Sequence, residues 1–257
     1  MNDFVLTMNQ LRYENRAFWR NPAAAFFTFA FPLMFLVIFN LLFGSEETGP
    51  RGQPITMSNF YIAAISAFSI IGATFTNLAI SVSFTRDAGT LKRVRGTPLP
   101  EYVYMVGRIV HSVLLSFLLV ALITIFGALF YDVDVPTNTI PAVLVALIVG
   151  GAAFSALGLA MTAAIPNADA SPAIVNGTIL PLLFISDVFI RLEDAPGWLV
   201  TLGDIFPVKH LSSAMQTAFN PHTSGAGFEW GDIGVIAAWG AAGLVLAIRF
   251  FSWEPRR

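Results

Sequence analysis

The sequence predicts an all-α membrane protein with six transmembrane helices. Hydrophobic residues make up 56% of its 257 residues, charged residues make up only 12%, and the mean hydropathy is +0.71. That charged fraction is about half of what a soluble domain carries, so a soluble chain of this length could not cover its surface. Composition therefore largely excludes a disordered protein, a nucleic-acid-binding protein and a secreted enzyme.

The first 22 residues predict an amphipathic helix in the plane of the membrane surface, not a cleavable signal peptide. They lack a continuous apolar stretch, and Arg12, Arg16 and Arg20 form a row at spacing four. An apolar face lies beside this row and consists of Phe4, Met8, Leu11 and Phe18. Asn21-Pro22 should break the helix, because a residue before proline disfavours the α conformation. The alternative is a solvated leader.

The rest of the chain, residues 23–257, contains six apolar stretches of about the length that crosses a bilayer. We expect these stretches to form one membrane domain of six helices. The expected spans are Ala23–Phe43, Ser58–Phe84, Arg108–Phe130, Ile140–Ile165, Pro172–Ile190 and Ile233–Phe251.

The distribution of charge predicts the orientation of the spans. With both termini in the cytoplasm, eleven of the fourteen basic residues lie inside, and only Arg51, Arg191 and Lys209 lie outside. An even number of spans agrees with this arrangement. We therefore expect a multi-pass protein of the plasma or inner membrane with both termini cytoplasmic.

Several kinds of chemistry are excluded by residues that the chain lacks. It has no cysteine, and its three histidines, His111, His210 and His222, are far apart in the sequence, so we expect no metal site. The two lysines, Lys92 and Lys209, do not follow glycine, so the chain has no Walker A motif. We expect no cofactor in this chain, and if ATP drives the protein, another chain must bind it.

The loop at residues 85–107 between the second and third spans is strongly basic. It predicts a short basic helix at the inner membrane surface, with Asp87 near its start and a stop at Gly96-Thr97-Pro98. The alternative is that these charges only set the topology and contact anionic lipid.

This loop and the fifth span resemble the type-2 ABC transporter permeases, the membrane subunits of drug, polysaccharide and lipid exporters, with daunorubicin-resistance exporters among them. The loop motif is Gly89-Thr90-Leu91-Lys92-Arg93-Val94-Arg95-Gly96-Thr97-Pro98-Leu99-Pro100. Weaker matches are Pro181–Phe189, Pro196-Gly197-Trp198 and Phe206-Pro207. Asp187 departs from the family pattern, where a small residue, commonly glycine, is more frequent.

The resemblance implies a permease that works as a homodimer or heterodimer with two ATP-binding subunits, which hold ATP and Mg²⁺. It implies that the loop helix is a coupling helix, in which Leu91 and Val94 fill a groove of the ATPase. The amphipathic leader would be a second element facing the ATPase, and the inner loop 166–172 a weaker third contact. The implied coupling residues are Arg86, Asp87, Gly89, Thr90, Leu91, Lys92, Arg93 and Arg95.

Two polar or aromatic rows are candidates for a substrate path. Phe27, Phe31 and Phe35 belong to a series at spacing four along the first span, and Ser66 and Asn77 lie on a polar face of the second. Bulk that faces lipid or a neighbouring helix explains the aromatic series equally well, and hydrogen bonds between helices explain the polar face.

Small residues in the fourth and sixth spans predict close helix packing, within the chain or across a dimer. They are Gly151, Ser155 and Gly158, and Gly234, Ala238 and Ala242.

The outer segment 191–229 predicts short helices that dip into the outer interface, with Trp198 at headgroup level and His210 as an interface residue rather than a ligand. The family resemblance suggests that this re-entrant segment is an outer gate, with Pro181, Asp187, Trp198 and Phe206 as its candidate residues. Asp187 could pair with Arg191 if the fifth helix continues.

We therefore expect the permease subunit of an ATP-driven exporter of an amphiphilic, drug-like or lipid substrate. The alternative is an ion-coupled secondary transporter or channel, which predicts buried charge at mid-membrane depth or inverted repeats. A membrane-embedded enzyme is a third class, but the chain has no Gly-x-Ser-x-Gly, no Ser-x-x-Lys and no His-Glu pair.

Overall fold

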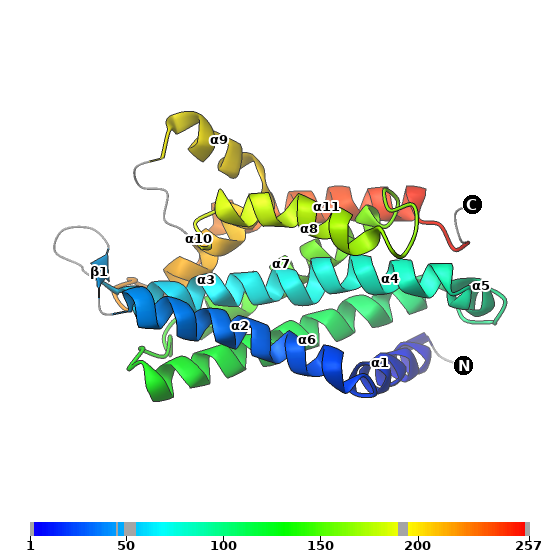
Figure 1. Ribbon diagram of the computed structural model, residues 1–257, viewed down its shortest axis with the longest axis horizontal. Coiled ribbons are helices and arrows are strands. Elements are labelled where there is room, and N and C mark those ends of the chain that lie inside the picture. Colours follow the sequence, from blue (N-terminus) through cyan, green and yellow to red (C-terminus); the bar gives the residue numbers. More distant parts are fainter. Residues whose placement is uncertain (1–2, 45, 49–54, 190–194, 255–257) are drawn as a thin grey trace.

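The structure is a computed structural model that describes residues 3–44, 46–48, 55–189 and 195–254. These residues form an elongated bundle of roughly parallel and antiparallel helices (Figure 1). The helices are α1 (Asp3–Trp19), α2 (Pro22–Phe43), α3 (Met57–Ile71), η1 (Gly72–Thr76), α4 (Asn77–Asp87), α5 (Thr90–Arg95), α6 (Glu101–Phe130), α7 (Ile140–Met161), α8 (Ser171–Phe184), α9 (Gly197–Ile205), α10 (Pro207–Phe219) and α11 (Trp230–Phe250). Two short strands, β1 (Glu47–Thr48) and β2 (Ile55–Thr56), pair antiparallel.

Within the described residues, five helical segments are long and apolar enough to cross a membrane. They are α2, the continuous segment Met57–Asp87, α6, α7 and α11. The segment Met57–Asp87 has 31 residues. At about 1.5 Å per residue it is roughly 46 Å long, more than the ~30 Å of a hydrocarbon core. Its surplus length carries α4 beyond the bundle centre, toward α5 (Figure 1).

The fifth expected span is shorter than the sequence suggested. A helix was expected over Pro172–Ile190, but α8 has 14 residues and ends at Phe184. Pro181 lies inside α8 near this end, and proline weakens a helix because it lacks an N–H donor. The N–H of Ile185 still bonds to the Pro181 carbonyl, and Asp187 then adopts a left-handed conformation with φ of 52°. The apolar residues after Phe184 therefore form turns, not helix.

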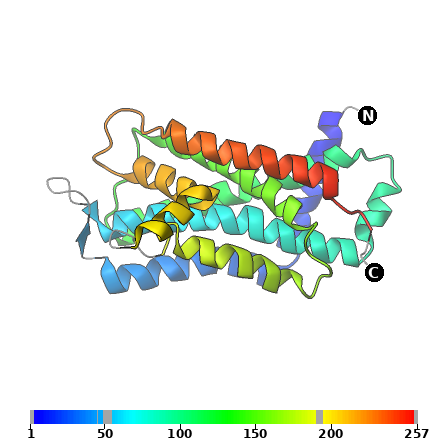
Figure 2. The ribbon, with the colours of Figure 1, turned by 90° about the horizontal axis from the view of Figure 1, so that it is seen from above.

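The junction between α1 and α2 follows the expected break. The Asn21 side chain accepts a hydrogen bond from the Ala24 N–H at 3.2 Å, and Pro22 occupies the first turn of α2. Both features favour the start of a helix. As a result α1 leaves the direction of the bundle and crosses its end (Figure 2).

Helices α7 and α11 pack closely because glycines face the neighbouring backbone. A Cβ on Gly243 would lie 2.9 Å from the Leu157 nitrogen, and one on Gly240 would lie 2.7 Å from the Ala153 Cβ. Gly158 also lies on α7 and faces η1, where its Cβ would lie 2.8 Å from the Phe75 carbonyl oxygen. Small residues permit this proximity.

The small residues predicted for packing on the sixth span are not the ones that pack within the chain. Gly234, Ala238 and Ala242 are all exposed on α11, whereas Gly240 and Gly243 are buried. The predicted row therefore lies on a different face of α11 from the face that contacts α7. Packing across a dimer remains the open alternative for the exposed row.

The two ends of the bundle differ in content. One end holds α1, α5 and the tail after α11, so the described chain begins and ends on the same side (Figures 1 and 2). The other end holds the strand pair, α9 and α10 (Figure 1). We call these the α5 end and the α9 end.

Candidate functional site

The basic loop helix, α5, is anchored into the bundle by one leucine. Gly89 precedes it in a left-handed conformation with φ of 70°, which glycine adopts without strain. Leu91 is fully buried in what we call the inner apolar cluster. The cluster joins α4, α5, α6, α7, α11 and the tail, and consists of Leu78, Val82, Leu91, Tyr104, Leu159, Ala247 and Trp253. The expectation that Leu91 fills a groove of a partner is therefore corrected, because its groove belongs to its own chain.

Arg86 and Asp87, at the end of α4, bind the segment that links α7 to α8. Arg86 is only 1% exposed, and its two terminal nitrogens donate to the carbonyls of Thr162 and Ile165 at 2.9 and 2.8 Å. Asp87 contacts the Arg86 Nε at 3.3 Å and accepts a hydrogen bond from the Ala168 N–H. A direct contact of Arg86 with a partner is thus excluded in this conformation. The pair instead joins the end of α4 to the connection between α7 and α8.

The outward surface of α5 is basic. Lys92, Arg93 and Arg95 are exposed, while Thr90 is half-buried. Lys92 lies 4.0 Å from Glu254, and Arg95 lies 3.3 Å from Glu101. Exposed ion pairs of this kind contribute little stability, so these cations are available to a partner.

Trp253 is a member of the inner apolar cluster that sequence reasoning missed. It is buried, and its ring centroid lies 5.6 Å from that of Tyr104. The available signal was a lone tryptophan in a polar tail directly after the last span. Such a side chain seeks an apolar surface to cover.

A second inner contact fixes α1 on the start of α6. Glu14 lies 3.6 Å from Arg108, with side-chain exposures of 11% and 10%. Arg108 also donates to the Tyr104 hydroxyl at 2.8 Å and to the Ser81 hydroxyl at 3.2 Å. Helix α1 approaches α6 closely at Gly107, where a Cβ would lie 2.5 Å from Gln10. The row Arg12, Arg16 and Arg20 stays exposed.

The candidate substrate-path residues are brought together only in part. Phe27 is exposed on the outside of α2. Phe31 contacts Phe35 with ring centroids 4.8 Å apart, and Phe35 stacks on Phe189 at 5.5 Å. Ser66 is fully buried in α3. Packing and lipid contact thus account for these residues better than a shared path does.

Asn77 is the exception, because it borders an open volume. It lines a cavity of about 240 Å³ at the α5 end, together with Glu14, Ser81, Arg108 and His111. Glu14 and Arg108 pair with each other there, so neither is free to bind a charged solute.

The candidate gate residues at the α9 end are also dispersed. Trp198 is 69% exposed on α9, and Pro181 is exposed on α8. The carbonyl of Asp187 accepts hydrogen bonds from Ser212 and Gln216 at 3.2 and 3.0 Å, which ties the turn after α8 to α10. The predicted pair of Asp187 with Arg191 is not tested, because Arg191 lies outside the described residues.

Phe206 does border a cavity. It stacks on Trp239 at 5.9 Å and faces an apolar pocket of about 300 Å³ between α7, α8, α10 and α11. Trp239 also donates to the Ile205 carbonyl at 2.9 Å. His210 bridges Asp232 and the Asp204 carbonyl at 2.7 and 2.9 Å. These contacts hold α9 against α10 and α11.

Comparisons with known proteins show that this chain is similar to transport permeases. The chain is 26% identical over 249 residues to the daunorubicin resistance ABC transporter permease protein DrrB1 of Streptomyces coeruleorubidus, covering 93% of this chain and 81% of that protein. It is 26% identical over 226 residues to the putative transport permease ycf38 of Porphyra purpurea, covering 84% and 76%. It is 20% identical over 200 residues to the putative transport permease YvfS of Bacillus subtilis, covering 78% and 80%.

The family described as ABC-2 type transporter matches residues 7–220, which include α5, both inner contacts and the α9 end. The resemblance inferred from the loop motif is confirmed. This chain is a multi-pass membrane transport permease that belongs to the ABC-2 type transporter family.

Proposed function

We propose that this chain is the permease subunit of an ATP-driven exporter, and that α5 transmits the movement of a separate ATPase subunit to the spans. One observation carries the proposal. Leu91 joins α5 to α4, α6, α7 and α11 through the inner apolar cluster, while the opposite surface of α5 presents Lys92, Arg93 and Arg95. A force on the basic surface therefore reaches four helices at once, because packed interiors shift as units.

The roles of the coupling residues divide accordingly. Lys92, Arg93 and Arg95 contact the ATPase, and Thr90 and Gly89 shape the helix start. Leu91 transmits the displacement, and Arg86 with Asp87 makes the loop before α8 move with α5. ATP and Mg²⁺ are held by the partner.

The proposed membrane arrangement has six crossings, with α8 and the turns after it as the fifth. It divides the chain into an interfacial helix, residues 1–22, and a permease domain, residues 23–257. Both termini lie in the cytoplasm, which the position of α1 and the tail at one end of the bundle supports (Figure 1). Helices α9 and α10 form the outer re-entrant segment, and Phe206 and Asp187 take part in its gate.

The proposed assembly contains two permease chains and two ATPase subunits. The exposed small residues Gly234, Ala238 and Ala242 on α11 offer a face for close helix association. The substrate is an amphiphilic drug-like or lipid molecule. The apolar pocket beside Phe206 supports that class.

The first test is co-purification with the ATPase encoded beside this chain, followed by vanadate-sensitive ATP hydrolysis in lipid. We expect Lys92→Glu/Arg93→Glu/Arg95→Glu to reduce complex formation by at least tenfold, because each charge reversal opposes the partner. The control is Arg249→Glu, compared with Arg93→Glu alone, because Arg249 is exposed on α11, outside both α5 and α1.

A wild-type complex lost only in the α5 variant supports the proposal. A wild-type chain that transports substrate with no ATPase present would overturn it in favour of an ion-coupled transporter.

A further inference from the structure

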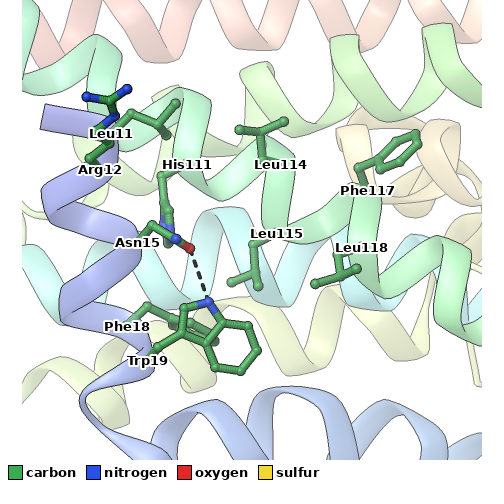
Figure 3. Close-up of a pocket in the computed structure, with 10 residues that line it drawn as sticks. All are labelled: Leu11, Arg12, Asn15, Phe18, Trp19, His111, Leu114, Leu115, Phe117 and Leu118. Carbon is green, nitrogen blue, oxygen red and sulfur yellow. Dashed lines mark hydrogen bonds between the residues drawn. The ribbon is translucent and has the colours of Figure 1, made fainter. Parts of the chain in front are cut away.

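A groove of about 440 Å³ lies between α1 and α6 at the α5 end of the bundle (Figure 3). Arg12, Asn15 and Trp19 line it from α1, and Leu114, Phe117 and Leu118 line it from α6. It is separate from the α5 surface and from the apolar pocket beside Phe206.

The two walls of this groove differ in polarity. On α1, Arg12 is exposed, and Asn15 accepts a hydrogen bond from the Trp19 indole at 3.1 Å. On α6, Leu114, Phe117 and Leu118 are about half exposed and follow one another along the helix (Figure 3). A ligand that fits both walls has a polar head and an apolar chain.

The directions of α1 and α6 suit a lipid as this ligand. Helix α1 crosses α6 at a steep angle, so α1 lies along the membrane surface when α6 spans the bilayer (Figures 2 and 3). The groove then begins at headgroup level beside α1 and continues toward the hydrocarbon core along α6.

Charge selects an anionic headgroup. The acids of α1 are engaged elsewhere, because Glu14 pairs with Arg108 and Asp3 accepts a hydrogen bond from Tyr102. Arg12 has no acidic partner among the described residues, and no carboxylate lines the groove. A positive charge with no counterion attracts an anion at the membrane surface.

We propose that this groove binds an anionic phospholipid from the leaflet on which α1 lies. Its phosphate contacts Arg12 and Asn15, Trp19 lies at the level of the glycerol backbone, and one acyl chain lies along Leu114, Phe117 and Leu118. The bound lipid holds α1 against α6. The inference rests on the proposed position of α1 at the membrane surface.

The test uses tryptophan quenching in vesicles that contain brominated phosphatidylglycerol or brominated phosphatidylcholine at equal mole fraction. The full chain is reconstituted, and the Trp19 signal is the difference between wild type and Trp19→Phe. We expect phosphatidylglycerol to quench Trp19 more strongly. Arg12→Gln should lower the apparent affinity for phosphatidylglycerol about fivefold, which corresponds to about one surface arginine. Arg16→Gln is the matched control, because Arg16 is on the same helix but outside the groove.

Each outcome bears on the proposal. Preferential quenching that is lost in Arg12→Gln and kept in Arg16→Gln supports it. Equal quenching by both lipids, or equal loss in both variants, overturns the lipid site but leaves α1 at the membrane surface. Absence of quenching by either lipid overturns the site together with the position of α1, whereas loss of the α5-dependent ATPase complex would not affect this result.

Discussion

Arg86 shows how a single side chain can serve the site without touching a partner. Its charge and its place in the basic loop suggested an external contact. Buried at the end of α4, it bonds instead to the carbonyls of Thr162 and Ile165, which lie in the connection after α7. Its guanidinium is suited to this role because it donates in several directions at once.

We expect Arg86→Met to destabilise the fold by about 3–5 kcal/mol, because it leaves the Thr162 and Ile165 carbonyls without their side-chain donor and the Asp87 carboxylate without its cationic partner. The midpoint of thermal unfolding in detergent measures the loss. Arg93→Met is the control, since Arg93 is exposed, and it should stay within about 0.5 kcal/mol of wild type. Equal midpoints for the two variants would contradict this role.

Asp187 has a backbone conformation that few residues other than glycine adopt readily. It adopts a left-handed conformation with φ of 52°, where glycine is favoured and aspartate is one of the better-tolerated alternatives. Its carbonyl then faces Ser212 and Gln216 on α10. The turn after α8 is thereby fixed without a glycine.

At the scale of helices, the contact between α7 and α11 depends on which small residues face inward. Gly240 and Gly243 are buried against α7, and the regular row Gly234, Ala238 and Ala242 is exposed. Both rows have the composition of a packing face. Only the position of the neighbouring helix distinguishes them.

We therefore expect Gly243→Val to destabilise the bundle, because its Cβ would lie 2.9 Å from the Leu157 nitrogen and force the helices apart. Overpacking of this kind costs about 1–3 kcal/mol. Ala242→Val adds a comparable volume on the exposed face and should leave the unfolding midpoint of the isolated chain unchanged. The measurement is thermal unfolding in detergent, and a larger effect of Ala242→Val would reverse the assignment of the two faces.

At the scale of the molecule, the α5 end is a single connected unit. The inner apolar cluster joins α5 and the tail to four helices, and the Glu14–Arg108 pair joins α1 to the same helix that carries Tyr104. Movement of α5 and movement of α1 should therefore be linked through α6.

Breaking the Glu14–Arg108 pair tests this link. Glu14→Gln leaves Arg108 without its counterion in a largely buried position, which costs about 3–5 kcal/mol. We expect α1 to detach more often, so trypsin should cleave faster at Arg12, Arg16 and Arg20. The double variant Glu14→Gln/Arg108→Gln removes the unpaired charge and should return the cleavage rate toward wild type. A double variant cleaved as fast as the single one would show that the pair does not hold α1.

Much of the chain was predictable because its signals are local. Apolar length determined α2, α6, α7 and α11 to within several residues at each end, and the basic motif with Gly89 and Gly96 located α5. Asparagine at position 21 and proline at position 22 separated α1 from α2. The basic loop motif, Gly89–Pro100, also indicated the family, because a sequence motif depends on residue types and not on contacts.

The sequence by itself thus determined that this is a helical membrane permease with a basic loop helix. Only the tertiary structure decided which side of each element is used. It placed Leu91 and Arg86 inward and Lys92 outward, chose Gly243 over Ala242 for packing, and brought Trp253 to the loop helix. The physical reason is that burial depends on where distant segments meet. Periodicity shows that a face exists but not which neighbour covers it.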